Sequence, residues 1–215
     1  MYKAALFDLD GTLADTFGDI AASVNRFLSE EGYPLRTKEE ILAAVSFGRR
    51  EFVRRSLPAS ATPAEVDRGV IRYTEIYQKH FMDTTTPYPG MPELITRLKS
   101  AGMKVAVVTN KAHPNAVRMV ETVYPDGLFD SIRGLSDLPA KPDPATALET
   151  ARFLGVDPSE CAFIGDSELD MLTAENAGMT PVGVSWGYRP VSVLLESGAA
   201  AIVHSASELE ALLLG

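Results

Sequence analysis

Aspartate residues directly follow two apolar runs of this chain. Asp8 and Asp10 follow a first such run, Asp166 ends a second, and Asp170 lies one helical turn further along. Acids are poor strand formers, and a buried carboxylate costs several kcal/mol unless it is paired or bound to a metal. In an extended segment Asp8 and Asp10 project to the same side. Four carboxylates gathered in one place would repel one another without a cation, and an all-oxygen ligand set favours a hard ion such as Mg²⁺.

Groups that can bind an anion follow other apolar stretches. Thr109 and Asn110 close the apolar run 105–108 and offer a hydroxyl and an amide. Lys141 precedes two prolines that flank an acid, a rigid turn that would hold the lysine in place. Gly11 would let backbone N–H groups approach an anion. Each residue alone also fits a structural role, such as a turn, a helix cap or a solvated surface lysine. Together with Mg²⁺ and a nucleophilic carboxylate they indicate phosphoryl transfer through an aspartyl-phosphate.

The elements that must position these residues alternate between strand and helix patterns. Glycine follows several of the helical patterns, as is usual at helix ends. This alternation predicts a doubly wound, Rossmann-like α/β core with a parallel sheet, whose strands carry their carboxyl ends to one ligand-binding edge. Strands are expected at 3–8, 104–109, 130–134, 161–166, 180–185 and 200–203, and helices at 91–101, 113–123, 144–154 and 169–177.

One long stretch interrupts the alternation. Residues 16–82 show only helical patterning, and a segment of that length is too long for a simple connection between a strand and the next helix. The turn-rich sequence at 84–90 marks its end. We therefore predict an all-helical cap subdomain at 16–82, inserted into an α/β catalytic core formed by residues 1–15 and 83–215.

Composition restricts the partners. The 215 residues include 20 Lys+Arg and 29 Asp+Glu, for a net charge of −9, which disfavours nucleic acid and anionic membrane surfaces. A small anionic metabolite remains compatible if a bound cation supplies positive charge. The single cysteine excludes a disulfide framework, and no apolar run approaches the ~20 residues of a membrane span. We expect a cytoplasmic protein without nucleic-acid or membrane partners, and the sequence specifies no oligomeric state.

Four short motifs, in order along the chain, carry a resemblance to a known family. They are FDLDGTLADT, VVTN, KPDP and GDSELDM. With them the sequence resembles the haloacid dehalogenase superfamily of phosphohydrolases. The segments PYPGM, AENAG and SWGYRP are most similar to its phosphoglycolate phosphatase-like branch. The helical insertion corresponds to the small cap domain of this superfamily.

The resemblance implies a role for each core residue. Asp8 would attack the substrate phosphorus, and Asp10 would protonate the leaving alkoxide and then activate the hydrolytic water. The transferring phosphoryl group would be held by Thr109, Asn110 and Lys141, with Gly11 beside them. The implied Mg²⁺ ligand set is Asp8, the backbone carbonyl of Asp10, and Asp166, with Asp170 positioning a metal-bound water.

Substrate selection is expected in the cap. Arg49, in the segment SFGRRE, would suit a second anionic group on the substrate, such as a carboxylate or another phosphate. The neighbouring Arg50, Arg54 and Arg55 are spaced as a solvated helix face.

The sequence therefore predicts a Mg²⁺-dependent phosphatase for a small phosphorylated metabolite, with 2-phosphoglycolate as the hypothetical substrate. Two other enzymes stay open, a β-phosphoglucomutase-like sugar-phosphate transferase and an inorganic pyrophosphatase. A phosphorylatable signalling module of the receiver type also places acids, Thr and Lys around Mg²⁺. It is disfavoured because such modules are shorter and lack the helical insertion.

Overall fold

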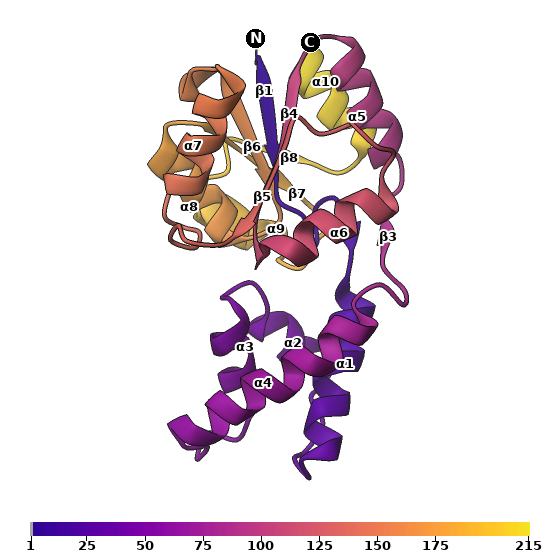
Figure 1. Cartoon of the computed structure of the whole chain (residues 1–215). Coiled ribbons are helices and arrows are strands. Elements are labelled where there is room, and N and C mark those ends of the chain that lie inside the picture. Colours follow the sequence, from indigo (N-terminus) through magenta and orange to yellow (C-terminus); the bar gives the residue numbers. More distant parts are fainter. Residues whose placement is uncertain (1) are drawn as a thin grey trace. The chain divides into compact units, whose positions relative to one another are not determined.

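The computed structural model describes residues 2–215, which form two compact units (Figure 1). One unit consists of residues 2–15 together with 86–215, and the other of residues 16–85. The chain passes between the units at 15/16 and at 85/86, next to the expected boundaries at 15/16 and 82/83. That the first unit is a catalytic core and the second its cap stays a prediction.

A six-stranded, entirely parallel sheet organises the first unit, in the order β5-β4-β1-β6-β7-β8. The central strands are buried on both faces because their runs are apolar throughout. This confirms the predicted doubly wound α/β core. β4 extends past the expected end at residue 109, through Thr109 and Asn110. The strands of this sheet are β1 (Ala4–Phe7), β4 (Lys104–Ala112), β5 (Ser131–Leu135), β6 (Cys161–Gly165), β7 (Thr180–Val184) and β8 (Ala201–Val203).

The register of the central strands sets the carboxyl ends of β1 and β6 nearly level, and β4 continues past them to Ala112. Phe7, the last residue of β1, pairs with Val107 of β4 on one side and with Ile164 of β6 on the other. From β1 the chain continues through β4 and β5 in one direction and returns to β6, β7 and β8 in the other. Ligands of open α/β sheets bind at such a reversal of strand order, outside the carboxyl ends. The segments that follow β1, β4 and β6 are therefore the ones to examine for chemistry.

Helices cover both sides of this sheet. α5 and α10 pack against each other on one side, while α7 and α8 pack on the other (Figure 1). A short antiparallel ribbon of β2 and β3 stands beside the main sheet, and neither this ribbon nor α9 and α10 was predicted. The ribbon strands are β2 (Ala14–Asp15) and β3 (Thr86–Pro87), and a 3₁₀ turn, η1, spans Pro158–Glu160. The helices of this unit are α5 (Met91–Ser100), α6 (His113–Val123), α7 (Ala145–Leu154), α8 (Glu168–Ala177), α9 (Val191–Glu196) and α10 (Ala206–Leu214).

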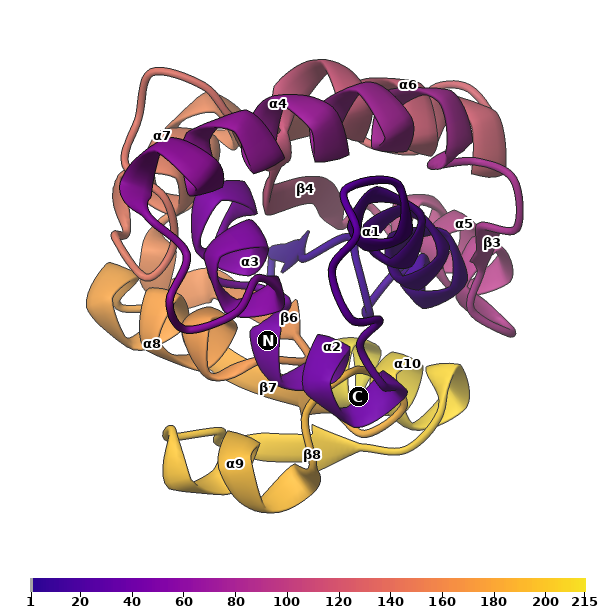
Figure 2. The same cartoon turned by 90° about the horizontal axis from the view of Figure 1, so that it is seen from below.

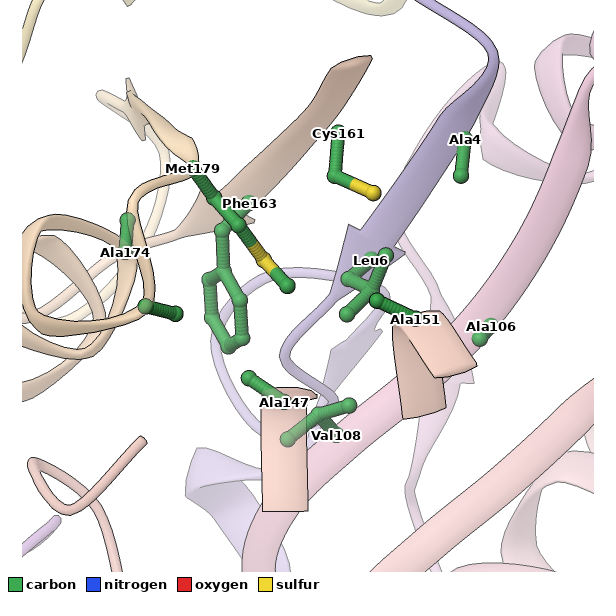
Figure 3. Packing of buried hydrophobic residues seen from close by; sticks show 11 residues of the cluster. Ala4, Leu6, Ala106, Val108, Ala147, Ala151, Cys161, Phe163, Ala174 and Met179 are labelled. Carbon is green, nitrogen blue, oxygen red and sulfur yellow. The ribbon is translucent and has the colours of Figure 1, made fainter. Parts of the chain in front are cut away.

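In the core under α7 and α8, alanines of the helices pack against larger side chains of the sheet such as Leu6 and Phe163 (Figure 3). Phe163 is fully buried in it, and Ala147 and Ala151 present only methyl groups from α7. Small side chains let a helix lie close to the sheet, so this packing holds the carboxyl ends of β1 and β6 rigidly. Cys161 is buried in the same cluster, where burial raises the pKa of its thiol to about 11. A thiol with that pKa is inert at neutral pH.

The second unit, residues 16–85, consists of four helices joined by loops and contains no strand. α1 and α3 both pack against α4 (Figure 2). Capping boxes begin α2 at Thr37 and α4 at Thr62. The buried carboxylate of Asp19 ties the end of this unit to its beginning, because it accepts hydrogen bonds from the N–H and hydroxyl groups of Thr84 and Thr85. Its helices are α1 (Phe17–Glu30), α2 (Lys38–Ala44), α3 (Arg49–Ser56) and α4 (Pro63–His80).

Within residues 2–215, no helix combines the length and the apolar character needed to cross a membrane.

Candidate active site

Three buried carboxylates converge beyond the carboxyl ends of β1 and β6. Asp8 follows β1, Asp166 follows β6, and Asp170 lies in the first turn of α8. One carboxylate oxygen from each lies within 4.8 Å of the other two. Three of the four acids singled out in the sequence thus meet where the doubly wound fold places a ligand.

Lys141 is the cation next to this cluster. Its Nζ lies 2.9 Å from Asp8 Oδ1 and 2.5 Å from Asp170 Oδ1, and its side chain is only 5% exposed. Burial by itself lowers the pKa of Lys141, but the carboxylates of Asp170 and Asp8 outweigh burial and raise that pKa above its ordinary value. Lys141 therefore carries a positive charge at neutral pH.

One ammonium does not neutralise three carboxylates. Burial, and next to it the charge of Asp170, raise the pKa of Asp8 to about 6. Burial and the charges of Asp170 and Asp8 raise the pKa of Asp166 well above its ordinary value. Asp8 Oδ1 contacts Lys141 as an ion pair, yet no group within residues 2–215 donates to this oxygen with hydrogen-bond geometry. The cluster thus has excess negative charge and an unsatisfied buried oxygen, and both features fit a bound metal ion.

Asp166 is held from four sides. Its Oδ1 accepts a hydrogen bond from Thr12 Oγ1 at 3.2 Å, and its Oδ2 accepts one from the Tyr188 N–H at 2.7 Å. Gly11 and Gly187 press on the same carboxylate so closely that a Cβ atom on either would overlap it. Gly11 also has a φ of +82°, which favours glycine, and its N–H donates to the Ala14 carbonyl.

The packing at Gly187 gives a direct prediction. Gly187→Ala places a methyl group against the Asp166 side chain and must displace it, because the overlap includes the Asp166 Cβ atom. A displacement of that kind is expected to lower kcat by about 10²-fold and to weaken metal binding. Phosphate-release kinetics and titration of the metal-free protein with Mg²⁺ measure the two effects.

Gly155→Ala is the matched control for this variant. Gly155 ends α7 with a φ of +70° and has open space around its Cβ position. Its replacement is expected to cost about 1 kcal/mol of stability through backbone strain and to leave turnover unchanged. Equal activity of Gly187→Ala and wild type would contradict the positioning of Asp166 by this loop.

Ser167, at the start of α8, fixes Asp170, and Asn110, near the end of β4, fixes Lys141. Asp170 Oδ2 accepts hydrogen bonds from the Ser167 N–H at 3.0 Å and the Ser167 hydroxyl at 2.6 Å, a contact within the first turn of α8. Asn110 holds the backbone of Lys141, since Asn110 Oδ1 accepts from the Lys141 N–H at 2.8 Å and its Nδ2 donates to the Lys141 carbonyl at 3.3 Å. The Asn110 amide thus positions Lys141, and its predicted contact with phosphate stays a prediction.

A second lysine, which the sequence reasoning missed, lies at the same edge of the sheet. Lys111 Nζ lies 2.8 Å from Oδ1 and 3.1 Å from Oδ2 of Asp10. The Lys111 side chain is only 5% exposed. Its backbone N–H donates to Oγ1 of the buried Thr109 at 3.3 Å. Lys111 directly follows the predicted pair Thr109 and Asn110, and strand β4 carries all three to the edge.

Arg49 is the one predicted site residue that belongs to the helical unit. It begins α3, and its Nη1 donates to Thr74 Oγ1 of α4 at 3.2 Å. Its contact with a substrate stays a prediction. The neighbouring arginines lie on a solvated face, as expected, where Arg50 pairs with Asp67 and both Arg54 and Arg55 pair with Glu51.

The structure thus has a doubly wound parallel sheet with buried acids and a lysine at its carboxyl edge, an arrangement that could hold a hard cation and an anionic ligand. Residues 5–184 match the family described as haloacid dehalogenase-like hydrolase. The chain belongs to this family, which confirms the expectation from the four motifs.

Individual relatives agree with this assignment. The chain is 34% identical to the phosphoglycolate phosphatase of Caulobacter vibrioides, over 93% of this chain and 85% of the relative. It is also 34% identical to that of Chromobacterium violaceum, over 96% of this chain and 94% of the relative. A crystal structure of a predicted phosphoglycolate phosphatase from Haemophilus somnus superposes with a TM-score of 0.91 at 26% identity, covering 98% of this chain and 97% of the other. The chain is thus a hydrolase similar to phosphoglycolate phosphatases.

Proposed function

We propose that this protein is a Mg²⁺-dependent phosphatase that hydrolyses 2-phosphoglycolate through a phosphorylated Asp8. The observation that carries the proposal is the buried Asp8 carboxylate, which lies between Lys141 and the other acids and has an oxygen without a hydrogen bond. A lysine beside a nucleophilic carboxylate reduces the repulsion between that carboxylate and an incoming phosphate dianion.

The metal would be held by Asp8, Asp166 and the backbone carbonyl of Asp10, with Asp170 oriented toward the same place by Ser167. Carboxylate and carbonyl oxygens select a hard cation, and the buried cluster contains neither histidine nor cysteine. When bound, Mg²⁺ would neutralise charge on the transferring phosphoryl group.

The proposed reaction uses two acids, Asp8 and Asp10. Asp8 donates an electron pair to phosphorus while the bond from phosphorus to the leaving oxygen breaks, and Asp10 gives that oxygen its proton. Water then attacks the phosphorus of the aspartyl-phosphate, Asp10 removes a proton from this water, and the Asp8 carboxylate leaves. Phosphate and glycolate are the products, and both acids return to their starting states. Thr109 and Lys141 would hold the phosphoryl oxygens in both steps.

The choice of 2-phosphoglycolate is supported by the relatives, which are named for that activity at about one-third identity over nearly the whole chain. The test compares 2-phosphoglycolate with β-glucose 1-phosphate, pyrophosphate and p-nitrophenyl phosphate, with phosphate release as the readout. We expect kcat/KM for 2-phosphoglycolate to exceed the others by at least about tenfold. Isomerisation of the glucose phosphate without phosphate release would identify a mutase instead, and preferred cleavage of pyrophosphate would identify a pyrophosphatase.

A further inference from the structure

Lys111 has no part in the mechanism above, although its ammonium group contacts Asp10, one of the two acids of that mechanism. It is a lysine with a nearly inaccessible side chain, and its ammonium group contacts both carboxylate oxygens of Asp10. Burying an ammonium group is costly, so a lysine in this place needs anionic neighbours. In the structure the Asp10 carboxylate is such a neighbour. When Asp10 carries the proton that it gives to the leaving oxygen, a carboxylate on the substrate would supply the negative charge instead.

The phosphate ester of an α-hydroxy acid has a geometry that suits the surroundings of Lys111 and Asp10. Asp10 must lie at hydrogen-bond distance, about 2.7 Å, from the oxygen that links phosphorus to the leaving group. In such a substrate the carboxylate oxygens are three bonds from that same oxygen, at about 3 Å. An ammonium group 2.8 Å from Asp10 can therefore reach the substrate carboxylate while it remains beside Asp10.

We propose that Lys111 determines specificity by binding a carboxylate adjacent to the phosphate ester of the substrate. This inference rests on the proposed phosphatase function and deepens it, because it assigns the second anionic group of the substrate to a residue of the sheet. From the sequence we had predicted that Arg49 of the helical unit binds this second anionic group. Lys111 differs from Arg49 in position, since it shares β4 with Thr109 and contacts the acid that serves the leaving oxygen.

A simpler role for Lys111 would be to hold Asp10 in place. Positioning of Asp10 affects alkyl phosphates with similar leaving groups alike, whereas recognition of a carboxylate affects only substrates that carry one. The ratio of kcat/KM between two substrates within one variant separates these roles, and it does not depend on how much of the variant is correctly folded.

The experiment measures wild type, Lys111→Met and Lys111→Arg on 2-phosphoglycolate and on ethyl phosphate, in which a methyl group replaces the carboxylate. We expect Lys111→Met to lower kcat/KM for 2-phosphoglycolate by about 100-fold, mainly through KM, and for ethyl phosphate by less than about fivefold. Lys111→Arg, which keeps the charge, should recover at least about a tenth of the wild-type value for 2-phosphoglycolate. The control is Lys104→Met, which replaces an exposed lysine at the opposite end of β4 and should have wild-type activity.

Three outcomes would overturn the proposal. The first is an equal loss of kcat/KM on both substrates in Lys111→Met. The second is an equal kcat/KM of wild type for ethyl phosphate and 2-phosphoglycolate. The third is a loss of kcat/KM for 2-phosphoglycolate alone that occurs in Arg49→Gln and not in Lys111→Met. Activity on p-nitrophenyl phosphate, followed in parallel, shows whether phosphatase chemistry itself survives.

A binding measurement tests the inference without turnover. Calorimetric titration of Asp8→Asn with 2-phosphoglycolate in Mg²⁺ is expected to give an affinity at least about tenfold higher than titration of Asp8→Asn/Lys111→Met. Equal affinities would overturn the role of Lys111 even if no substrate of the panel is hydrolysed.

Discussion

Asp8→Asn is expected to lower phosphate release by at least about 10⁴-fold, with KM little changed. The amide has nearly the shape of the carboxylate but is not nucleophilic, so the phosphoenzyme cannot form. Steady-state phosphate release with 2-phosphoglycolate measures the loss. Asp126→Asn, which changes an exposed acid in the loop after α6, is the matched control and should keep full activity. Turnover by Asp8→Asn within tenfold of wild type would disprove covalent catalysis by Asp8.

The same variant has an expected effect on stability. In the metal-free protein the pKa of Asp8 is raised from 3.8 to about 6, so the folded state holds this proton more tightly than the unfolded state does. Wild type therefore loses stability as the pH rises from about 4 to 6, by about 3 kcal/mol in all, and Asp8→Asn escapes this loss. Urea unfolding in EDTA should show the variant more stable at pH 8 and equal to wild type at pH 4. A constant difference between these pH values would contradict the burial of an ionised Asp8.

Removal of divalent cations is expected to stop turnover. Chelation with EDTA should reduce phosphate release by at least about 10³-fold, and added Mg²⁺ should restore it. The reason is the excess charge of Asp8, Asp166 and Asp170, which a phosphate dianion would otherwise have to approach. An enzyme that is indifferent to EDTA after exhaustive dialysis would refute a metal at this cluster.

Thermal stability provides a second measurement of Mg²⁺ binding. Mg²⁺ should raise the melting temperature of the metal-free protein, because the cation relieves carboxylate repulsion that exists only in the folded state. The effect should weaken as the pH falls through about 6, since protonation of Asp8 competes with the metal. It should also be smaller in Gly187→Ala than in Gly155→Ala.

Much of the fold could be read from the sequence because its signals are local. The apolar runs that form β1, β4 and β6 are buried on both faces, and the expected helix at 113–123 is observed with the same bounds. The ribbon of β2 and β3 was missed because its strands have two residues each, too few to show a period. α9 and α10 were also not predicted.

The residues of the site show the same difference between those with a local sequence signal and those without one. Local patterns placed Asp8, Asp166 and Asp170 correctly, because an acid at the end of an apolar strand is a short-range signal and parallel strands carry their ends to a common edge. The groups that hold these acids carry no comparable signal. Thr12 reaches Asp166 from 154 positions away, and Lys111 reaches Asp10 from 101 positions away.

By itself the sequence determined the chemistry available to this protein, namely carboxylates, a lysine and hydroxyl donors at the ends of strands in a doubly wound sheet. Tertiary structure decided how these groups are paired: Asn110 with the backbone of Lys141, Lys111 with Asp10, and Gly187 with Asp166. The physical reason is that residue type and period fix which side of an element a group occupies. The partner that it meets there depends on the register and packing of segments far apart in the chain.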